Sequence, residues 1–375
     1  MGKRANHEGS VYQRSKDGRW VAVLILEDGR RRAFYGATQA DALAKKNEAA
    51  RQLSDGLLIT SDRITVAQLF ERYLASVKPH VRHKTFRSYE QQAHLHIVPA
   101  LGPRRIARLS SDELDRFISA QLKAGLSERS VGILHAIIRQ ALNWGMVQRP
   151  PLVRFNVAQT VKAPRVPYRE VQPFTPDEAR QFVRAVRGHR LGAFFVVTLS
   201  CGLREGEALA LHWSDVDTED RELRVRYTLQ RVNGDWAFLE PKSHKSRRTI
   251  PLPEFAVAAL RDHRAKQAEE RLRVGELWKD QGLVFTTRTG GPLSARNVLR
   301  DFQAVLSRAG MRSGTIHSLR HGCASLLAAS GASMKEAQEI LGHSSYQLTA
   351  NLYTHVFEQA KRDAMDRMDA FMALP

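Results

Sequence analysis

Residues 198–217, with the sequence TLSCGLREGEALALHWSDVD, decide the fold of this chain. The pattern predicts an apolar helix that runs into Gly202 and a second helix, containing Glu207, that begins just after Arg204. Arg204 would then lie at a helix entry between two packed segments, where a buried arginine is costly unless it pairs with an anion. Two interpretations stay open: Arg204 forms an internal ion pair with Glu207, or it binds a phosphate while Glu207 holds it in place.

A basic segment follows, EPKSHKSRRTIP at residues 240–251. Strand-like residues 223–229 and 236–239 precede it, and a strand resumes at residues 249–250. The segment is therefore predicted to form a hairpin tip, which carries Lys242, Lys245, Arg247 and Arg248. Such a tip can reach into a DNA groove, although a loop that only binds phosphates would have the same composition.

Two histidine-containing segments come next. In TIHSLRH, residues 315–321, His317 and Arg320 are three positions apart and would share one helix face. His317 and His321 could suggest a metal, but no nearby Glu or Cys completes a zinc signature, and we expect no metal site. The segment LGHSS then contains His343, and NLYTH contains Tyr353. A helical tyrosine is usually a packing residue, but Tyr353 follows every basic candidate in the sequence.

The N-terminal residues predict a small sheet with one helix. Strands are expected at residues 10–12, 20–26 and 31–35, with turns at Asp17-Gly18 and Asp28-Gly29 and a helix over residues 38–54 capped by Thr38. A three-stranded sheet of this kind is wide enough to enter a major groove. The alternative is a basic face that only aids solubility. The arginines that would contact DNA are Arg19, Arg30, Arg31 and Arg32.

Residues 62–160 predict helices with apolar stripes, for example residues 69–77, 114–122 and 133–144. Arg82, Lys84 and Arg87 lie between these stripes and would either face DNA or be solvated. Prolines at positions 150, 151, 164 and 167 predict an extended basic linker before a helix that starts at Thr175-Pro176.

Composition limits the function further. The chain has 375 residues, with 58 Lys and Arg against 39 Asp and Glu, so the formal net charge is +19. This balance favours a polyanionic partner. With only two cysteines, Cys201 and Cys323, we expect no disulfide framework. The sequence contains neither a signal-peptide pattern nor an apolar run long enough to span a membrane. A cytoplasmic, nucleoid-associated protein without membrane contact is expected.

Taken together, the motifs resemble the tyrosine recombinase (phage integrase) family, because five of them occur in the family's order. GLREGE resembles the first arginine box, PKSHKSRRTIPL the β-hairpin lysine motif, HSLRH the second box, and LGHSS and NLYTH the last two. The resemblance implies catalytic roles for Arg204, Lys242, His317, Arg320 and His343, with Glu207 in support and Tyr353 as nucleophile. Lys242 is preferred to Lys245 because it directly follows the strand and proline.

The resemblance also implies the architecture. We expect a multidomain, mainly helical protein with small β parts, in four regions. These are an arm-type DNA-binding domain (residues 1–60, three strands and a helix), a helical core-binding domain (61–160), a linker (161–172) and an α+β catalytic domain with a C-terminal tail (173–375).

The implied function is site-specific recombination through a 3′-phosphotyrosine and a Holliday junction, which would integrate or excise a mobile element or prophage. Four subunits would act on double-stranded DNA attachment sites, without a cofactor, and with a host bending factor and an excisionase as further partners. Two alternatives remain. One is a type IB topoisomerase or a resolvase; the other is a DNA-binding regulator on a degenerate recombinase fold.

Overall fold

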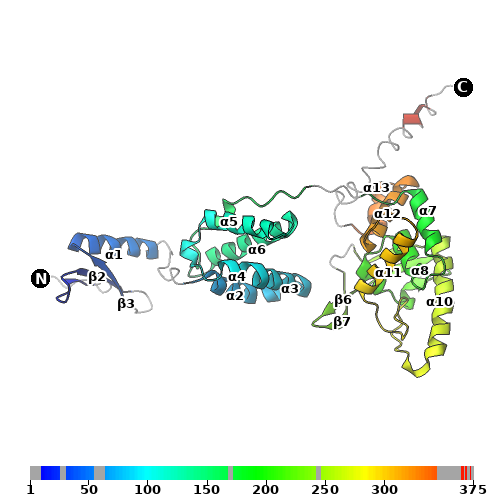
Figure 1. Cartoon of the computed structure of the whole chain (residues 1–375), viewed down its shortest axis with the longest axis horizontal. Coiled ribbons are helices and arrows are strands. Elements are labelled where there is room, and N and C mark those ends of the chain that lie inside the picture. The colour runs from blue at the N-terminus through cyan, green and yellow to red at the C-terminus, as the bar shows by residue number, and fades with distance from the viewer. Residues whose placement is uncertain are drawn as a thin grey trace. The chain divides into compact units, whose positions relative to one another are not determined.

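The computed structural model describes residues 10–25, 31–54, 64–167, 172–241 and 246–343, with residues 365, 366, 368, 369 and 372 near the end (Figure 1). The chain divides into two compact units between Arg169 and Glu170. Arg30, Lys242, Lys245 and Tyr353 lie outside the described residues.

The first part of the N-terminal unit is an antiparallel sheet covered by one helix (Figure 1). Its strands β1 (Val11–Gln13), β2 (Trp20–Ile25) and β3 (Arg31–Gly36) pair in the order β1-β2-β3, and α1 (Gln39–Ser54) packs on β2 and β3. Thr38 Oγ1 accepts a hydrogen bond from the backbone N–H of Asp41 at 3.2 Å, so the predicted helix start is confirmed.

The register of this sheet separates two neighbouring arginines. Arg32 pairs with Leu24, which packs against α1, whereas Arg31 pairs with Ile25 on the opposite face. Successive side chains of a strand point to opposite faces, so Arg31 and Arg32 cannot both belong to one flat DNA-contacting surface. The face of Arg31 also carries two exposed tyrosines, Tyr12 and Tyr35.

The second part of this unit is helical. It contains α2 (Val66–Val77), α3 (His83–Gln92), α4 (Val98–Leu101), α5 (Ser111–Lys123) and α6 (Glu128–Val147), and a π-helical turn at Ala93–Ile97 joins α3 to α4. Tyr73 and Trp144 lie in ring contact at 6.0 Å, and the Trp144 indole N–H donates to Ser76 Oγ at 3.0 Å. These contacts join α2 to α6, and the core of this part is built from the predicted stripes. The prediction is wrong for Ile133, which is 42% exposed.

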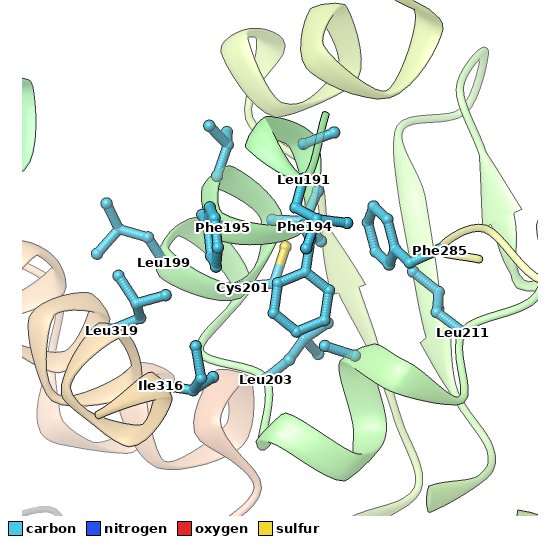
Figure 2. Close-up of a cluster of buried hydrophobic side chains, with 14 of the residues drawn as sticks. Leu191, Phe194, Phe195, Leu199, Cys201, Leu203, Leu211, Phe285, Ile316 and Leu319 are labelled. Carbon is cyan, nitrogen blue, oxygen red and sulfur yellow. The ribbon is translucent and has the colours of Figure 1, made fainter. Parts of the chain in front are cut away.

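The C-terminal unit is built around α8 (Gly192–Cys201), which is apolar on nearly all sides and therefore buried. The ring centroid of Phe194 lies 5.6 Å from that of Phe195 and 5.2 Å from that of Phe285, and both contacts are edge-on (Figure 2). Leu199 lies beside Leu319 of a neighbouring helix (Figure 2). Each such side chain contributes about 1.5–3 kcal/mol through burial, so α8 is a rigid support for the residues at its end.

Further helices and a small sheet make up most of the rest of this unit. The helices are α7 (Pro176–Ala185), capped by Thr175 as predicted, α9 (Glu205–Leu209), α10 (Glu254–Val274), α11 (Ala295–Arg308), α12 (Ile316–Ala329) and α13 (Met334–Leu341). A small sheet, in the order β4-β5-β8, contains β4 (Val216–Asp217), β5 (Glu222–Val225) and β8 (Arg248–Pro251).

The expected single strand over residues 223–229 and the hairpin tip at the basic segment are both wrong. The strand β5 ends at Val225, and a separate strand, β6 (Thr228–Val232), begins at Thr228. β6 pairs with β7 (Asp235–Leu239) through a turn at Asn233 and Gly234. Both turn residues have positive φ, 53° and 97°, as a two-residue Asn-Gly hairpin turn requires. Because β8 pairs with β5, the basic segment connects two different sheets.

The predicted fold class, mainly helical with small antiparallel sheets and an N-terminal three-stranded sheet, is confirmed. Among the described residues, no helix combines the length and the apolar character that crossing a bilayer requires.

Candidate active site

The first part of the site lies at the junction between α8 and α9. Arg204 is the residue before α9, and its backbone N–H donates to Glu207 Oε2 at 3.0 Å while its Nη1 donates to Glu207 Oε1 at 2.6 Å. Glu207 is 4% exposed. Both interpretations of the sequence therefore share one geometry: the internal ion pair exists, and it fixes the direction in which the remaining Arg204 donors point.

A second arginine reaches the same carboxylate from β8. Arg248 Nη2 donates to Glu207 Oε2 at 3.1 Å, and the Arg248 side chain is only 6% exposed. Its Nε and Nη1 donate to the carbonyls of Ile340 and Ser246. The expectation that Arg248 contacts DNA is therefore corrected, because this side chain lies inside the protein with acceptors on all three nitrogens.

The third arginine, Arg320, projects from α12 and is 2% exposed. Its Nη1 donates to the carbonyl of Gly202 at 2.5 Å, and its Nη2 donates to the carbonyl of Leu341 at 2.6 Å. A Cβ at position 202 would lie 2.4 Å from Leu341 Cδ2, and Gly202 has a φ of +59°. Glycine therefore allows the end of α8 to approach the end of α13 closely enough for one guanidinium to bridge them.

The three arginines also share the end of α13. Three successive carbonyls there each accept a hydrogen bond from a different arginine. Arg248 donates to Ile340 O, Arg320 donates to Leu341 O, and Arg204 Nη2 donates to Gly342 O at 3.2 Å. The last carbonyls of a helix lack partners within the helix and carry partial negative charge. The arginines therefore fix the end of α13 and, with it, His343, whose backbone N–H donates to Gln338 O.

Charge is unbalanced in this cluster. In the described part of the chain, the cluster holds three guanidiniums and one carboxylate, that of Glu207, which pairs with Arg204 and Arg248, while Arg320 donates to two carbonyls. Burial alone would raise the pKa of Glu207, but the charges of Arg248 and Arg204 outweigh it and hold that pKa below its usual value. Burial, together with nearby Arg204, lowers the pKa of Arg320 to about 9. The excess positive charge suits an anionic ligand.

The histidines beside the arginines are held neutral at pH 7. Burial, followed by the charge of Arg320, lowers the pKa of His343 to about 3, and the same two causes lower that of His317. His321 lies edge-on to His317, with ring centroids 4.6 Å apart, and burial lowers its pKa to about 4. Neutral imidazoles can accept or donate a proton or a hydrogen bond. No cluster of three or more metal-ligating side chains occurs among the described residues.

The structure thus brings together Arg204, Glu207, His317, Arg320 and His343, which the sequence indicated as separate motifs. An adjoining cavity of about 530 Å³ is lined by residues of β8, including Arg248, by residues of α13, and by the flanking Arg247 and His343. Arg247 is half-exposed and pairs with Glu240.

Of the described residues of the N-terminal unit that are expected to contact DNA, all except Arg32 are exposed. Arg82, Lys84 and Arg87 are exposed around the start of α3, and Arg19 and Arg31 are exposed on the small sheet, whereas Arg32 is half-buried with its guanidinium over the Phe34 ring.

Two family models match the chain. One describes the phage integrase family and matches residues 172–360, and the other describes the N-terminal SAM-like domain of phage integrases and matches residues 65–121. A protein named tyrosine recombinase XerC-like from Caldanaerobacter subterraneus subsp. tengcongensis is 31% identical, with 98% of this chain and 99% of the relative covered. An integrase of Streptomyces ambofaciens is also 31% identical, with 94% and 93% covered.

Solved structures share the fold. The integrase of the Tn1549 transposon, bound to transposon right end DNA, matches with a TM-score of 0.66 at 22% identity, over 82% of this chain and 100% of that one. A lambda integrase tetramer bound to a Holliday junction matches with a TM-score of 0.58 at 18% identity, over 93% and 96%.

Proposed function

The chain belongs to the phage integrase family of tyrosine recombinases, enzymes that cleave and rejoin DNA, and from this membership we propose how its own residues perform that reaction. The observation that carries the proposal is the arginine cluster, in which one buried carboxylate faces three guanidiniums. A phosphodiester would supply the missing negative charge. In the described part of the chain, Arg204 and Arg320 each use two of the five N–H groups of a guanidinium on protein acceptors, and other N–H groups of these side chains would bind the phosphate oxygens.

The cleavage step is a balanced transesterification. The Tyr353 oxygen attacks the phosphorus, the Tyr353 O–P bond forms, and the bond from phosphorus to the 5′ oxygen of the next nucleotide breaks. His317 accepts the tyrosine proton, for which its lowered pKa leaves it neutral, and Lys242 protonates the departing oxygen. His343 donates a hydrogen bond to the phosphate. The ester is conserved in the phosphotyrosine, so rejoining is the reverse step and needs no ATP, metal or other cofactor.

We propose that four copies act on two double-stranded DNA attachment sites and exchange strands through a Holliday junction. Support comes from fold-mates, one of which is a lambda integrase tetramer on a Holliday junction and another a Tn1549 integrase on transposon DNA. The products would be an integrated or excised mobile element or prophage. The reaction would take place on nucleoid DNA in the cytoplasm, with a host bending factor and an excisionase setting its direction.

The test is recombination between two duplexes that carry the candidate attachment core, identified as the direct repeat in the DNA flanking the integrated gene. The purified full chain should produce recombinant duplexes in EDTA and without ATP. Relaxation of any supercoiled plasmid, with no recombinants, would instead support the topoisomerase alternative. Binding of the core without an adduct would support the degenerate regulator.

We further propose the domain roles predicted from the sequence: arm-site binding by residues 1–60, core-site binding by 61–160, a linker at 161–172 and catalysis by 173–375. The open face of the N-terminal sheet supports arm binding, because it presents Arg31 with two exposed tyrosines and Arg14 over the Tyr35 ring at 5.5 Å. On the core-binding side, the exposed basic residues Arg82, Lys84 and Arg87 are the candidates for phosphate contact.

A chain without residues 1–60 is expected to lose tight binding to DNA flanking the core while it still cleaves the core itself. Each lost phosphate contact lowers the salt dependence of binding by roughly one unit of slope, so titrations at several salt concentrations measure the change. Equal affinity and equal slope on the full site, with and without these residues, would rule out the arm-binding role.

A further inference from the structure

Arg248 is the arginine that the catalytic motifs leave without a role. It lies on β8, where it pairs in register with Val225 of β5, so its backbone is fixed by the sheet. All three of its side-chain nitrogens donate to protein acceptors: Nη2 to Glu207 Oε2, Nε to the carbonyl of Ile340 at 2.6 Å, and Nη1 to the carbonyl of Ser246 at 3.1 Å. These three contacts hold the guanidinium on protein acceptors, although Arg248 also contributes to the wall of the cavity beside the site.

These contacts join two parts of the site that are far apart in sequence. Through Glu207, Arg248 meets the carboxylate that orients Arg204, and through Ile340 it meets the end of α13, three residues before His343. A planar guanidinium can serve a carboxylate and a carbonyl at the same time, which a lysine ammonium on a flexible stem cannot do with fixed geometry. Burying this charge would be costly if it only filled space.

We propose that Arg248 is a positioning residue for DNA cleavage, which sets the distance between the Arg204–Glu207 pair and the end of α13 that carries His343. This inference rests on the proposed function, since it assumes that Arg204 and His343 meet the phosphate. Arg248 itself does not touch the DNA.

The arrangement has a consequence for pH dependence. Glu207 is faced by Arg204 at the start of α9, Arg248 on β8 and Arg320 on α12, and the charge of Arg248 is the strongest influence that opposes burial. Without Arg248, the pKa of Glu207 rises, so the carboxyl becomes protonated at a higher pH. A protonated Glu207 binds Arg204 less well, and cleavage should therefore fall on the acid side at a higher pH than in the wild type.

The experiment compares Arg248→Gln, Arg248→Lys and the matched control Arg261→Gln in the full chain. Arg261 is half-exposed on α10 and contacts Glu219 and the carbonyl of Thr218. The substrate is a duplex of the attachment core with a nick beside the cleavage point, which traps the covalent complex in a single turnover. Rates are measured from pH 5 to 9, together with DNA affinity and melting temperature.

Arg248→Gln should cleave about 10–100-fold more slowly, as expected for small displacements of catalytic groups, with nearly unchanged DNA affinity and an acid limb moved to higher pH. Arg248→Lys restores the charge but not the two-way contact, so its pH profile should return toward that of the wild type while its rate stays low. Arg261→Gln should match the wild type in both.

The charge of Arg248 also helps to lower the pKa of His343, so the loss of Arg248 would raise that pKa as well. A further variant therefore tests which of the two groups causes the acid limb. In Glu207→Gln/Arg248→Gln, the shifted limb should disappear. A limb that persists there belongs to another group and overturns the proposed action through Glu207.

Two other results would overturn the role of Arg248: wild-type rates in Arg248→Gln, or a slower rate with an unmoved pH profile and a matching fall in melting temperature, which indicates a structural role alone. If the wild-type chain itself forms no adduct with the nicked core, the proposed function fails instead.

Discussion

Tyr353→Phe is expected to abolish the covalent protein–DNA complex while leaving DNA binding almost unchanged. The substitution removes one oxygen, and the proposed reaction has no other atom that can form the bond to phosphorus. A lost hydrogen bond from the same hydroxyl would change binding by only about 1 kcal/mol. The measurement is the nicked attachment-core duplex, resolved under denaturing conditions, with mass spectrometry of the DNA-linked peptide.

The matched control is Tyr227→Phe, which removes the same oxygen from a partly exposed tyrosine between β5 and β6. It should form the adduct at the wild-type rate. An adduct that persists in Tyr353→Phe would show that another residue is the nucleophile. Loss of DNA binding in the same variant would show that Tyr353 acts in recognition rather than in bond formation.

The sequence predicted best what local signals determine. Helix starts at Thr38 and Thr175 each follow from one capping side chain, and the structure confirms both. The placement of Arg204 at a helix entry, with Glu207 three residues later, is also local, since both hydrogen bonds lie within one turn.

Contacts between distant segments were not available from the sequence. From the sequence, Arg248 is one member of the basic run at residues 240–251. The pairing of β8 with β5 in the folded protein directs its side chain to Glu207. The use of the α13 carbonyls by three arginines depends likewise on how α8, α12 and α13 pack. The small size of Gly202 was visible, but its reason, close approach to Leu341, was not.

The misplaced hairpin had a signal that could have found it. Asn233-Gly234 lies between two strand-like runs, and this dipeptide is the strongest short-range indication of a two-residue turn. The basic run at residues 240–251 also lies between strand-like residues, and this position predicted a hairpin tip there instead. Backbone conformational preference is the better guide to where a chain reverses.

Arg320→Gln is expected to slow cleavage by about 10²–10³-fold, the loss that follows removal of one fixed donor to a reacting anion. The melting temperature of the same variant should change little. The substitution removes two hydrogen bonds, to the carbonyls of Gly202 and Leu341, but it also removes a buried charge that Arg204 repels. Single-turnover cleavage and thermal unfolding of the same preparation measure the two effects.

Arg312→Gln is the matched control with the opposite expectation. Arg312 is partly exposed, pairs with Glu178 and donates to the carbonyls of Gln172 and Pro173, so its loss should reduce stability by about 1 kcal/mol. Cleavage should be unchanged, because none of these partners belongs to the arginine cluster. A slow Arg312→Gln enzyme would mean that cleavage reports stability in general.

The contrast between these variants follows from what each guanidinium is paired with. Arg312 has a carboxylate of its own, whereas Arg320 is buried on two neutral carbonyls, and burial lowers its pKa to about 9. A buried cation that has no carboxylate in direct contact, as Arg320 has none among the described residues, is costly in the free protein, and a bound phosphate removes that cost. DNA should therefore raise the melting temperature of the wild type more than that of Arg320→Gln.

Equal stabilisation of both by the attachment core, together with a wild-type rate in Arg320→Gln, would mean that Arg320 serves the fold and not the phosphate. If Arg320→Gln does not fold, Arg320→Lys keeps the charge without the planar fork and should fold but cleave slowly.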